Sequence, residues 1–471
     1  MGKIKNTLSD IDPDIIICDA VIQTTKKGTT IKRISIKTKE RNRLCPHCNS
    51  EDCSINDSGK KRTVKHTPQS RVPTVIRFIQ RRFFCKHCKV TFMEQLDWLH
   101  PDLGITRELF HAIEDDLKHK LSKKEIARIN GVSEYYVSAV AKLLKPDKAN
   151  HMPEVLCIDE TAGDAEDHAS DTSTSVASKV KFVTNISDGR TGEVLDILPF
   201  KTAKKLVGYF NDNFTLEERS KVRFLCCDMG KAYLNLAKHC FPNAVVCLDN
   251  FHVTNRLNDA MDASRIKEQD RFLSAGEKAV YKDLKRLNKR FKTALDNQPA
   301  KWGTRGKDIS SRILTALGRS PELQDTYAML QYFHEIMHDC HDFASKSDQL
   351  DLWIRTFETS RSDIICGAVK AVKDHLPYIH NAWRHGLSNA TCEGNNRIIK
   401  AIKNFSFGVH SFTYLRTRVL LICGKPGVDR SRKKKERNVS DKTDMFFYDA
   451  FPSLEEYQPV FDWNTHPAAI N

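Results

Sequence analysis

The stretch Val155-Leu-Cys-Ile-Asp-Glu160 is an apolar run that ends in two adjacent acids. A short apolar run of this kind is typical of a buried strand. Two similar runs follow, Val222-Arg-Phe-Leu-Cys-Cys-Asp228 and Ala244-Val-Val-Cys-Leu-Asp249, and each also ends in an acid. We therefore expect a central sheet whose strands end in carboxylates, and this pattern decides the fold class of the middle of the chain.

The segments between these runs predict the order of elements around the sheet. A loop is expected from Thr161 to Ser178, because this segment is rich in Ser, Thr, Asp and Ala. A hairpin follows it, and helices are expected over Lys201–Phe210 and Tyr233–Cys240. The order is then three strands, helix, strand, helix, strand, which is the ribonuclease-H-like α/β plan. In that plan the first and fourth strands are neighbours, so Asp159 and Asp228 would lie side by side.

A third acid, Glu393, lies in the stretch Ser388-Asn-Ala-Thr-Cys-Glu-Gly-Asn-Asn-Arg-Ile-Ile-Lys400. In a helix from about Glu393, Arg397 and Lys400 follow at spacings of four and seven and share the face of the carboxylate. The simpler alternative is a surface helix with an ordinary Glu–Arg pair, worth roughly 0.2–0.5 kcal/mol. The acids at the strand ends favour a metal site beside phosphate contacts. The helical spacing of residues 254–383 predicts an α-helical insertion before this helix.

Three carboxylates suit phosphodiester chemistry with two Mg²⁺ (or Mn²⁺) ions about 4 Å apart, since hard cations prefer oxygen ligands. Asp159 would bridge the two ions, while Asp228 and Glu393 would each bind one. Each acid could instead be structural, and the competing acids are Glu160, Asp188, Asp196 and Asp249. His252 could orient the scissile phosphate or Asp249, or it could be structural.

Two CxxC pairs, Cys45-Pro-His-Cys48 and Cys85-Lys-His-Cys88, predict a structural Zn²⁺ site, because each turn aims two thiolates at one point. The gap between the pairs is long enough for a strand hairpin. It also leaves open replacement of a ligand by a neighbouring residue: Cys53, His47, His66 or His87. A redox dithiol is the remaining alternative. The strand expected over residues 75–84 carries three cations for DNA, namely Arg77, Arg81 and Arg82.

A helix-turn-helix is expected over residues 121–144. Ser122 and Glu125 form a capping box, and Gly131 permits the tight turn. The recognition helix would begin near Ser133 and present its exposed face to a major groove. The residues of that face are Ser133, Glu134, Tyr135, Ser138 and Lys142. The alternative is a plain helical hairpin.

Composition supports a polyanionic partner. The 471 residues include 75 Lys and Arg against 60 Asp and Glu, a net charge of +15, and residues 41–90 hold 12 cations against 3 acids. This imbalance favours double-stranded DNA, although a solvated basic surface is the alternative. The odd number of 15 cysteines predicts mostly reduced thiols. Without a membrane-length apolar run or a signal peptide, we expect a soluble cytoplasmic protein associated with the nucleoid.

The fold class expected is multidomain α+β. In chain order the expected domains are a β-rich zinc-binding module (1–100), a helix-turn-helix domain (101–150), a first catalytic part (151–253), the helical insertion (254–385), a last catalytic part with the Glu393 helix (386–424), and a basic linker with a C-terminal tail (425–471). The helix expected from Phe412 would direct Arg416 and Arg418 toward solvent or DNA. Residues 430–437 predict a flexible basic arm.

The ordered motifs, from the CxxC pairs to about Leu421, resemble the DDE-type insertion-sequence transposases of the ISL3 group. The resemblance implies that Asp159, Asp228 and Glu393 are catalytic. It also implies that the N-terminal modules bind terminal inverted repeats, and that cleavage and strand transfer depend on Mg²⁺. Two element ends call for two catalytic domains, so a homodimer or larger assembly on element and target DNA is expected.

Two residues depart from the group's pattern. Asn250 stands where a basic residue or proline is expected, and Ala390 stands where glycine is common. Neither departure removes an expected metal ligand. Two other functions stay open: a zinc and helix-turn-helix DNA-binding regulator without catalysis, and a ribonuclease-H-like nuclease without strand transfer.

Overall fold

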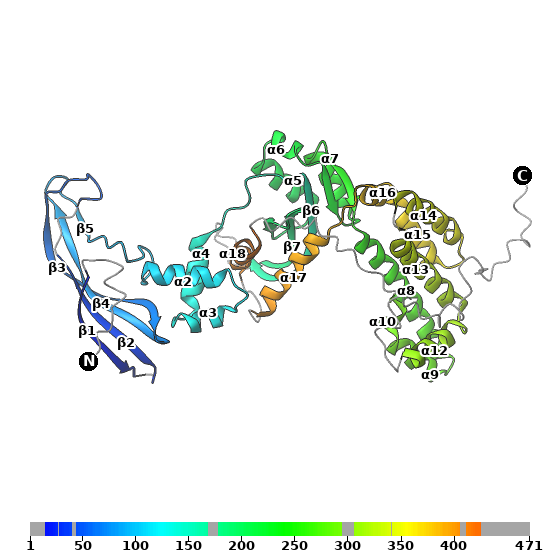
Figure 1. Ribbon diagram of the computed structural model, residues 1–471, viewed down its shortest axis with the longest axis horizontal. Helices are drawn as coiled ribbons and strands as arrows, with labels where there is room; N and C mark the ends of the chain where they lie inside the picture. Colours follow the sequence, from blue (N-terminus) through cyan, green and yellow to red (C-terminus); the bar gives the residue numbers. More distant parts are fainter. Residues whose placement is uncertain are drawn as a thin grey trace, which may run out of the picture.

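The computed structural model describes residues 15–26, 28–39, 44–167, 178–293, 306–340, 342–405 and 411–424. The described part is elongated, with a β module at one end, a mixed sheet in the middle and a helical lobe at the other end (Figure 1). The expected basic linker and tail, residues 425–471, lie outside the described residues. No helix among the described residues is long and apolar enough to cross a membrane.

The N-terminal module is a five-stranded sheet of order β1-β2-β4-β3, with β5 paired to β4. Its strands are β1 (Ile15–Thr24), β2 (Thr30–Thr38), β3 (Cys53–Gln69), β4 (Val72–Cys85) and β5 (Thr91–Met93). Along β4 alternate side chains are buried, as expected for a sheet with one covered face. Phe78 on this face packs edge-on against Trp98, with ring centroids 5.0 Å apart. The predicted strand hairpin between the two CxxC pairs is confirmed as β3 and β4.

Three short helices follow, α2 (Arg107–Leu117), α3 (Lys123–Ile129) and α4 (Glu134–Leu144). The Oγ atom of Ser122 accepts the N–H of Glu125 and caps α3. Gly131 has a φ of +61°, and a Cβ on it would lie 3.0 Å from Pro73. Glycine therefore meets two demands here, a left-handed turn and close packing. The predicted pair of helices is confirmed, and the second begins at Glu134, directly after Ser133.

These helices share an apolar core with α18 (Phe412–Cys423), the last described helix. Our prediction that Arg416 and Arg418 face solvent or DNA is wrong. Arg418 is buried and donates from Nη2 to the carbonyl oxygens of His119 and Leu121. Arg416 donates from Nε to Asp196. The reason is that the helix packs on two sides, so its cations satisfy carbonyl and carboxylate groups that would otherwise be buried unpaired.

The central sheet has the order β10-β9-β6-β7-β8. Its strands are β6 (Val155–Asp167), β7 (Ser178–Asp188), β8 (Val194–Leu198), β9 (Phe224–Cys227) and β10 (Val245–Leu248). Strands β6, β9 and β10 run parallel, whereas β6, β7 and β8 are antiparallel. The expected adjacency of the first and fourth strands is confirmed, since β6 pairs with β9.

The loop predicted from Thr161 begins too early. Residues 161–167 continue β6 and pair with the start of β7, for example Ala162 with Phe182. Strand pairing depends on the neighbouring strand more than on the intrinsic preference of Ala, Asp and Glu, so composition alone misplaced this boundary.

Helices cover both faces of the sheet. One face packs against α5 (Ala203–Asn213) and α7 (Lys231–Cys240), with α6 (Leu216–Ser220) between them in the chain. The other face packs against α17 (Ala390–Phe405) and α18. The sheet edge that follows β10 leads directly into the helical lobe.

Helices occupy the segment in which a helical insertion was expected, and they form the lobe at the far end of the molecule (Figure 1). Its described helices are α8 (Asn250–Ser274), α9 (Lys278–Arg286), α10 (Asn288–Phe291), α12 (Gly306–Leu317), α13 (Pro321–Asp339), α14 (Phe343–Phe357), α15 (Asp363–Asp374) and α16 (Leu376–His385). Helix α8 begins directly after Asp249, earlier than the start expected near Thr254. The Oδ1 atom of Asn250 accepts the indole N–H of Trp383 at 2.7 Å. Asn250, which differs from the residue expected in the group's pattern, thus joins the first and last helices of the lobe.

We predict that Arg418→Ala lowers the free energy of unfolding by about 2–4 kcal/mol, because the carbonyl groups of His119 and Leu121 lose a buried, charged donor. Arg397→Ala, on the exposed face of α17, should change it by less than about 0.5 kcal/mol. Urea denaturation of both variants measures the difference. Equal stabilities would show that Arg418 does not hold α18 to the N-terminal helices.

Candidate active site and metal centre

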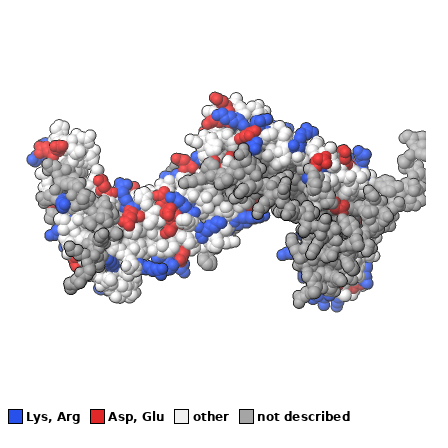
Figure 2. Space-filling view, viewed as in Figure 1, with Lys and Arg blue, Asp and Glu red and all other residues white. Residues whose placement is uncertain are grey.

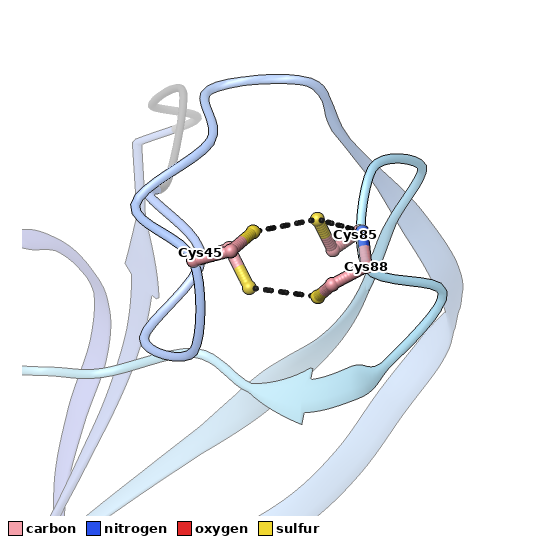
Figure 3. A group of neighbouring side chains, drawn as sticks. Cys45, Cys85 and Cys88 are labelled. Atoms are coloured by element: carbon pink, nitrogen blue, oxygen red, sulfur yellow. Dashed lines mark hydrogen bonds between the residues drawn. The ribbon is translucent and has the colours of Figure 1, made fainter.

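The four cysteines of the CxxC pairs converge at one point of the N-terminal sheet. Their sulfur atoms all lie within 4.8 Å of one another, and this is the only such group of potential metal ligands among the described residues. The Sγ atoms of Cys45 and Cys88 are 3.6 Å apart, as are those of Cys48 and Cys85 (Figure 3). A tetrahedral Zn²⁺ with bonds near 2.3 Å requires sulfur atoms about 3.8 Å apart. The quartet therefore fits zinc.

Of the alternative zinc ligands, Cys53 and His66 have other partners. The thiol of Cys53 donates to the carbonyl oxygen of Ser50, and the ring of His66 contacts the hydroxyl of Thr106 in the core. The backbone N–H of Cys88 donates to the Sγ of Cys85, and together with hydrogen bonds from neighbouring groups it lowers the pKa of the Cys85 thiol to about 6, whereas the pKa values of the Cys48 and Cys88 thiols are raised. A lowered thiol pKa favours the thiolate form that zinc requires.

The acids at the strand ends gather at one end of the central sheet. Asp159 lies just past the part of β6 that pairs with β9, Asp228 directly follows β9, and Asp249 directly follows β10. Glu393 lies in the first turn of α17, which packs on β6. The carboxyl ends of parallel strands meet at one edge, which explains why acids far apart in the sequence share one region.

The environment of Asp159 is both buried and acidic. Burial raises the pKa of Asp159, and the charges of Asp228 and Asp249 raise it further. The N–H of Glu160 donates to Oδ1 of Asp159 at 2.7 Å and lowers the pKa, as does the nearby His252. The net shift is upward, so a proton or a cation at this position relieves repulsion between the acids.

Glu393 belongs to the same electrostatic group. Burial raises the pKa of Glu393, and Asp249 and then Asp159 raise it further. The Oδ1 atom of Asp249 accepts the N–H of Asn389, whereas its buried Oδ2 atom accepts no N–H or O–H donor from the described residues. A buried carboxylate oxygen without a donor is costly unless a cation binds it. This orphaned oxygen, in a set of hard oxygen donors, fits Mg²⁺ or Mn²⁺ better than a softer metal.

Three of the four competing acids have structural partners. Glu160 accepts Lys201 Nζ at 2.9 Å and the hydroxyl of Tyr233 at 2.8 Å. Asp188 accepts N–H and hydroxyl groups within its own turn. Asp196 is held by Arg416 and by the hydroxyl of Tyr209. Only Asp249 among the four remains in the acidic group.

A chain of buried amides, absent from our sequence predictions, connects α17 to the sheet. Asn396 donates from Nδ2 to Oδ2 of Asp159 at 2.8 Å and accepts from Nδ2 of Asn185 at 3.3 Å. Asn185 in turn accepts the hydroxyl of Ser187, to which Asn395 donates. These side chains are all buried. One sequence feature could have indicated the role of Asn396: it lies three residues after Glu393, and this spacing places both residues on the same side of α17.

His252 lies in the first turn of α8, close to Asp159 and not bonded to the carboxylate of Asp249. Its Nε2 atom is 3.7 Å from Oδ1 of Asp159, and it has no hydrogen-bond partner among the described residues. We expected His252 to orient either the scissile phosphate or Asp249. Its position is compatible with contact to a substrate phosphate.

The side chains expected to contact DNA lie in three places. On β4, Arg77 and Arg82 are exposed, while Arg81 is held by the buried carboxylate of Glu94 at 2.6 Å. On α4, Ser133 and Tyr135 are exposed, and Ser138 is half-buried. On α17, Arg397 and Lys400 are exposed beyond Glu393. Arg81 thus has a structural partner that the strand pattern did not indicate.

Comparison with known proteins identifies the class. The model of the ISL3 family, described as transposase, matches residues 156–419, which is more than half of the chain. The chain therefore belongs to the ISL3 family of transposases. A second model, the zinc-finger of transposase IS204/IS1001/IS1096/IS1165, matches residues 41–88 and includes all four clustered cysteines.

Individual relatives are distant. The chain is 21% identical over 401 residues to the transposase for insertion sequence element IS1001 of Bordetella parapertussis, covering 83% of this chain and 91% of that protein. It is 22% identical over 251 residues to the transposase for insertion sequence element IS1557 of Mycobacterium tuberculosis (strain CDC 1551 / Oshkosh). That match covers 49% of this chain and 54% of the relative.

We predict that a Cys45→Ser, Cys85→Ser double variant loses bound zinc, because two thiolates cannot complete the tetrahedral set. Cys18→Ser, which changes an exposed cysteine outside the quartet, should retain it. Elemental analysis of the purified proteins measures the metal. An unchanged zinc content in the double variant would contradict the assignment of the four cysteines as zinc ligands.

Proposed function

We propose that this transposase binds the terminal inverted repeats of an insertion sequence and catalyses Mg²⁺-dependent strand cleavage and strand transfer. The observation that carries the proposal is the meeting of acids from β6, β9, β10 and α17 at one end of the central sheet. The strand order β10-β9-β6-β7-β8, with helices on both faces, supports a ribonuclease-H-like catalytic core.

Asp159, Asp228 and Glu393 are the proposed ligands for two divalent ions, and Asp249 is a neighbouring acid that could share them. When bound, the ions would activate a water or 3′-hydroxyl and stabilise the leaving oxyanion. The raised pKa values of Asp159 and Glu393 mean that cation binding competes with protonation above the usual carboxyl range. We therefore expect divalent binding to weaken as the pH falls toward that range.

The residues around the acids have supporting roles in this proposal. Asn396 fixes the rotamer of Asp159 by donating to Oδ2, which leaves Oδ1 facing His252. Arg397 and Lys400, exposed on the helix of Glu393, are placed to hold DNA phosphates near the acids. His252 could donate to the scissile phosphate.

DNA recognition is proposed for the zinc module and the helix-turn-helix. The exposed face of α4 would enter a major groove, while Arg77 and Arg82 would contact backbone phosphates. Because α4 packs on α18, and α18 packs on the central sheet, a bound element end would keep a fixed position relative to the acids. Two ends would require two copies of the chain.

We predict that Asp159→Asn and Glu393→Gln abolish divalent-dependent cleavage of a duplex carrying the element end, by roughly three orders of magnitude or more, while end binding persists. Glu160→Gln should retain most activity, because Glu160 is held by Lys201 and Tyr233 outside the acidic group. Gel assays of binding and nicking give both readouts.

The outcomes of this assay separate the rival functions. If the wild-type protein binds ends but never nicks them, the regulator without catalysis is favoured. If it nicks but never joins the 3′-hydroxyl to a second duplex, the nuclease is favoured. Strand joining that needs both acids supports the transposase.

We predict that Asn396→Ala reduces cleavage roughly ten- to hundredfold and raises the Mg²⁺ concentration needed for half-maximal rate, because Asp159 loses its orienting donor. The matched control is Asn395→Ala, which removes a buried amide that bonds Ser187 and the carbonyl of Gly192 but not Asp159. A Mg²⁺ titration of both variants decides the question. If both lose activity equally with unchanged Mg²⁺ dependence, the amides only dock α17.

A further inference from the structure

The outer tip of the helical lobe carries a row of exposed cations that have no role in the proposed catalysis or end recognition. On α9 and α10, Lys278, Lys282, Lys285 and Lys289 are separated by four, three and four residues. The spacing places Lys278, Lys282 and Lys285 on one side of α9, and Lys289 follows in α10 after the break at Leu287. Arg286 is exposed beside them, and we call these five residues the basic tip. Figure 2 shows Lys and Arg gathered at the lower end of this lobe.

The apolar side of the same two helices is buried and holds the basic tip in place. Leu284, Leu287 and Phe291 are buried in the large core cluster of the lobe. Phe291 packs edge-on against Tyr327 of α13, with ring centroids 6.1 Å apart. The cations are therefore presented outward by an ordered helix.

The five cations of the basic tip have no carboxylate partner among the described residues, whereas several other cations of the lobe do. Lys267 pairs with Glu322 at 2.6 Å, Lys373 pairs with Glu358 at 2.6 Å, and Arg312 pairs with Asp283 at 3.5 Å. The basic tip is left with its charge uncompensated.

Helix stability does not explain this arrangement. Lys285 and Arg286 lie in the last turn of α9, where cations favour the helix dipole. Lys278, however, is the first residue of α9, where a cation is unfavourable. Like charges three or four residues apart also repel each other and destabilise a helix. The row costs stability in the free protein, and an external polyanion would offset that cost.

We propose that the basic tip binds the phosphate backbone of double-stranded DNA, as a contact separate from the helix-turn-helix and the acidic site. Lys285 follows Lys278 by seven positions on α9, a length of about 10 Å along the helix, and Lys289 on α10 extends the row. Duplex DNA carries one charge per about 1.7 Å of its axis, so the row can contact several phosphates. The row consists mainly of lysines, which bind phosphate as point charges, so we expect the contact to be independent of sequence.

The choice of DNA as the polyanion rests on the proposed function. Two sources of DNA have this chemistry, the target duplex and the donor DNA that flanks the element end. Probes that contain one source and lack the other distinguish them.

The test removes three charges from the basic tip with Lys282→Gln, Lys285→Gln and Lys289→Gln combined. The matched control removes three exposed charges from other helices of the lobe with Lys267→Gln, Lys370→Gln and Lys373→Gln combined. Fluorescence anisotropy measures binding of the full chain to a long unrelated duplex and to an end duplex with or without flanking DNA, across a salt series.

The tip variant should bind at least one long probe about tenfold more weakly at physiological salt, with a log–log salt slope reduced by about two to three. Binding to the end duplex without flanking DNA should change less than about twofold for both variants. Weakening only on the unrelated duplex assigns the tip to target DNA, and weakening only on the flanked end assigns it to donor DNA.

Equal binding of all long probes by the tip variant, the control and the wild type would overturn the proposal. This result is distinguishable from failure of the proposed catalysis. If the wild type never cleaves DNA but the tip variant alone loses long-duplex affinity, the basic tip stands and the catalytic proposal falls. Thermal melting of both variants verifies that the substitutions leave the fold intact.

Discussion

Holding like charges together is the constraint on which this structure depends. Asp159, Asp228, Asp249 and Glu393 come from separate elements, and their repulsion opposes a shared site. The opposing force is the docking of α17 on the sheet, through Ile399 and Ile402 in the core and through the amide chain from Asn185 to Asn396. Buried amides have directional requirements, so they fix the position of α17 along the sheet more sharply than apolar contacts do.

The same docking connects the acidic region to the rest of the chain. Helix α18 follows α17 and packs on both the sheet and the N-terminal helices α2 and α4, where Arg418 satisfies two carbonyl groups. On the other side, α8 begins at the strand end that carries Asp249. The N-terminal helices are thus attached through α18, which packs on the helix of Glu393, and the helical lobe through α8, which begins beside Asp249.

Much of this organisation was predictable because it is encoded locally. The CxxC spacing, the serine cap before α3, and the apolar runs before Asp159 and Asp228 each depend on neighbouring residues. The partners of long-range polar groups were not predictable in this way. Arg81, Arg416 and Arg418 had the pattern of exposed cations, yet each bonds a residue distant in the sequence.

The amino-acid sequence by itself determined the cysteine quartet and the order of strands and helices. These properties follow from residue type and spacing, which need no knowledge of packing. Only the tertiary structure decided which acids remain together: it gave Glu160, Asp188 and Asp196 structural partners and left Asp249 beside Glu393 with an unpaired oxygen. The physical reason is that the role of a carboxylate depends on which donors reach it, and those donors come from elements that meet only in the folded chain.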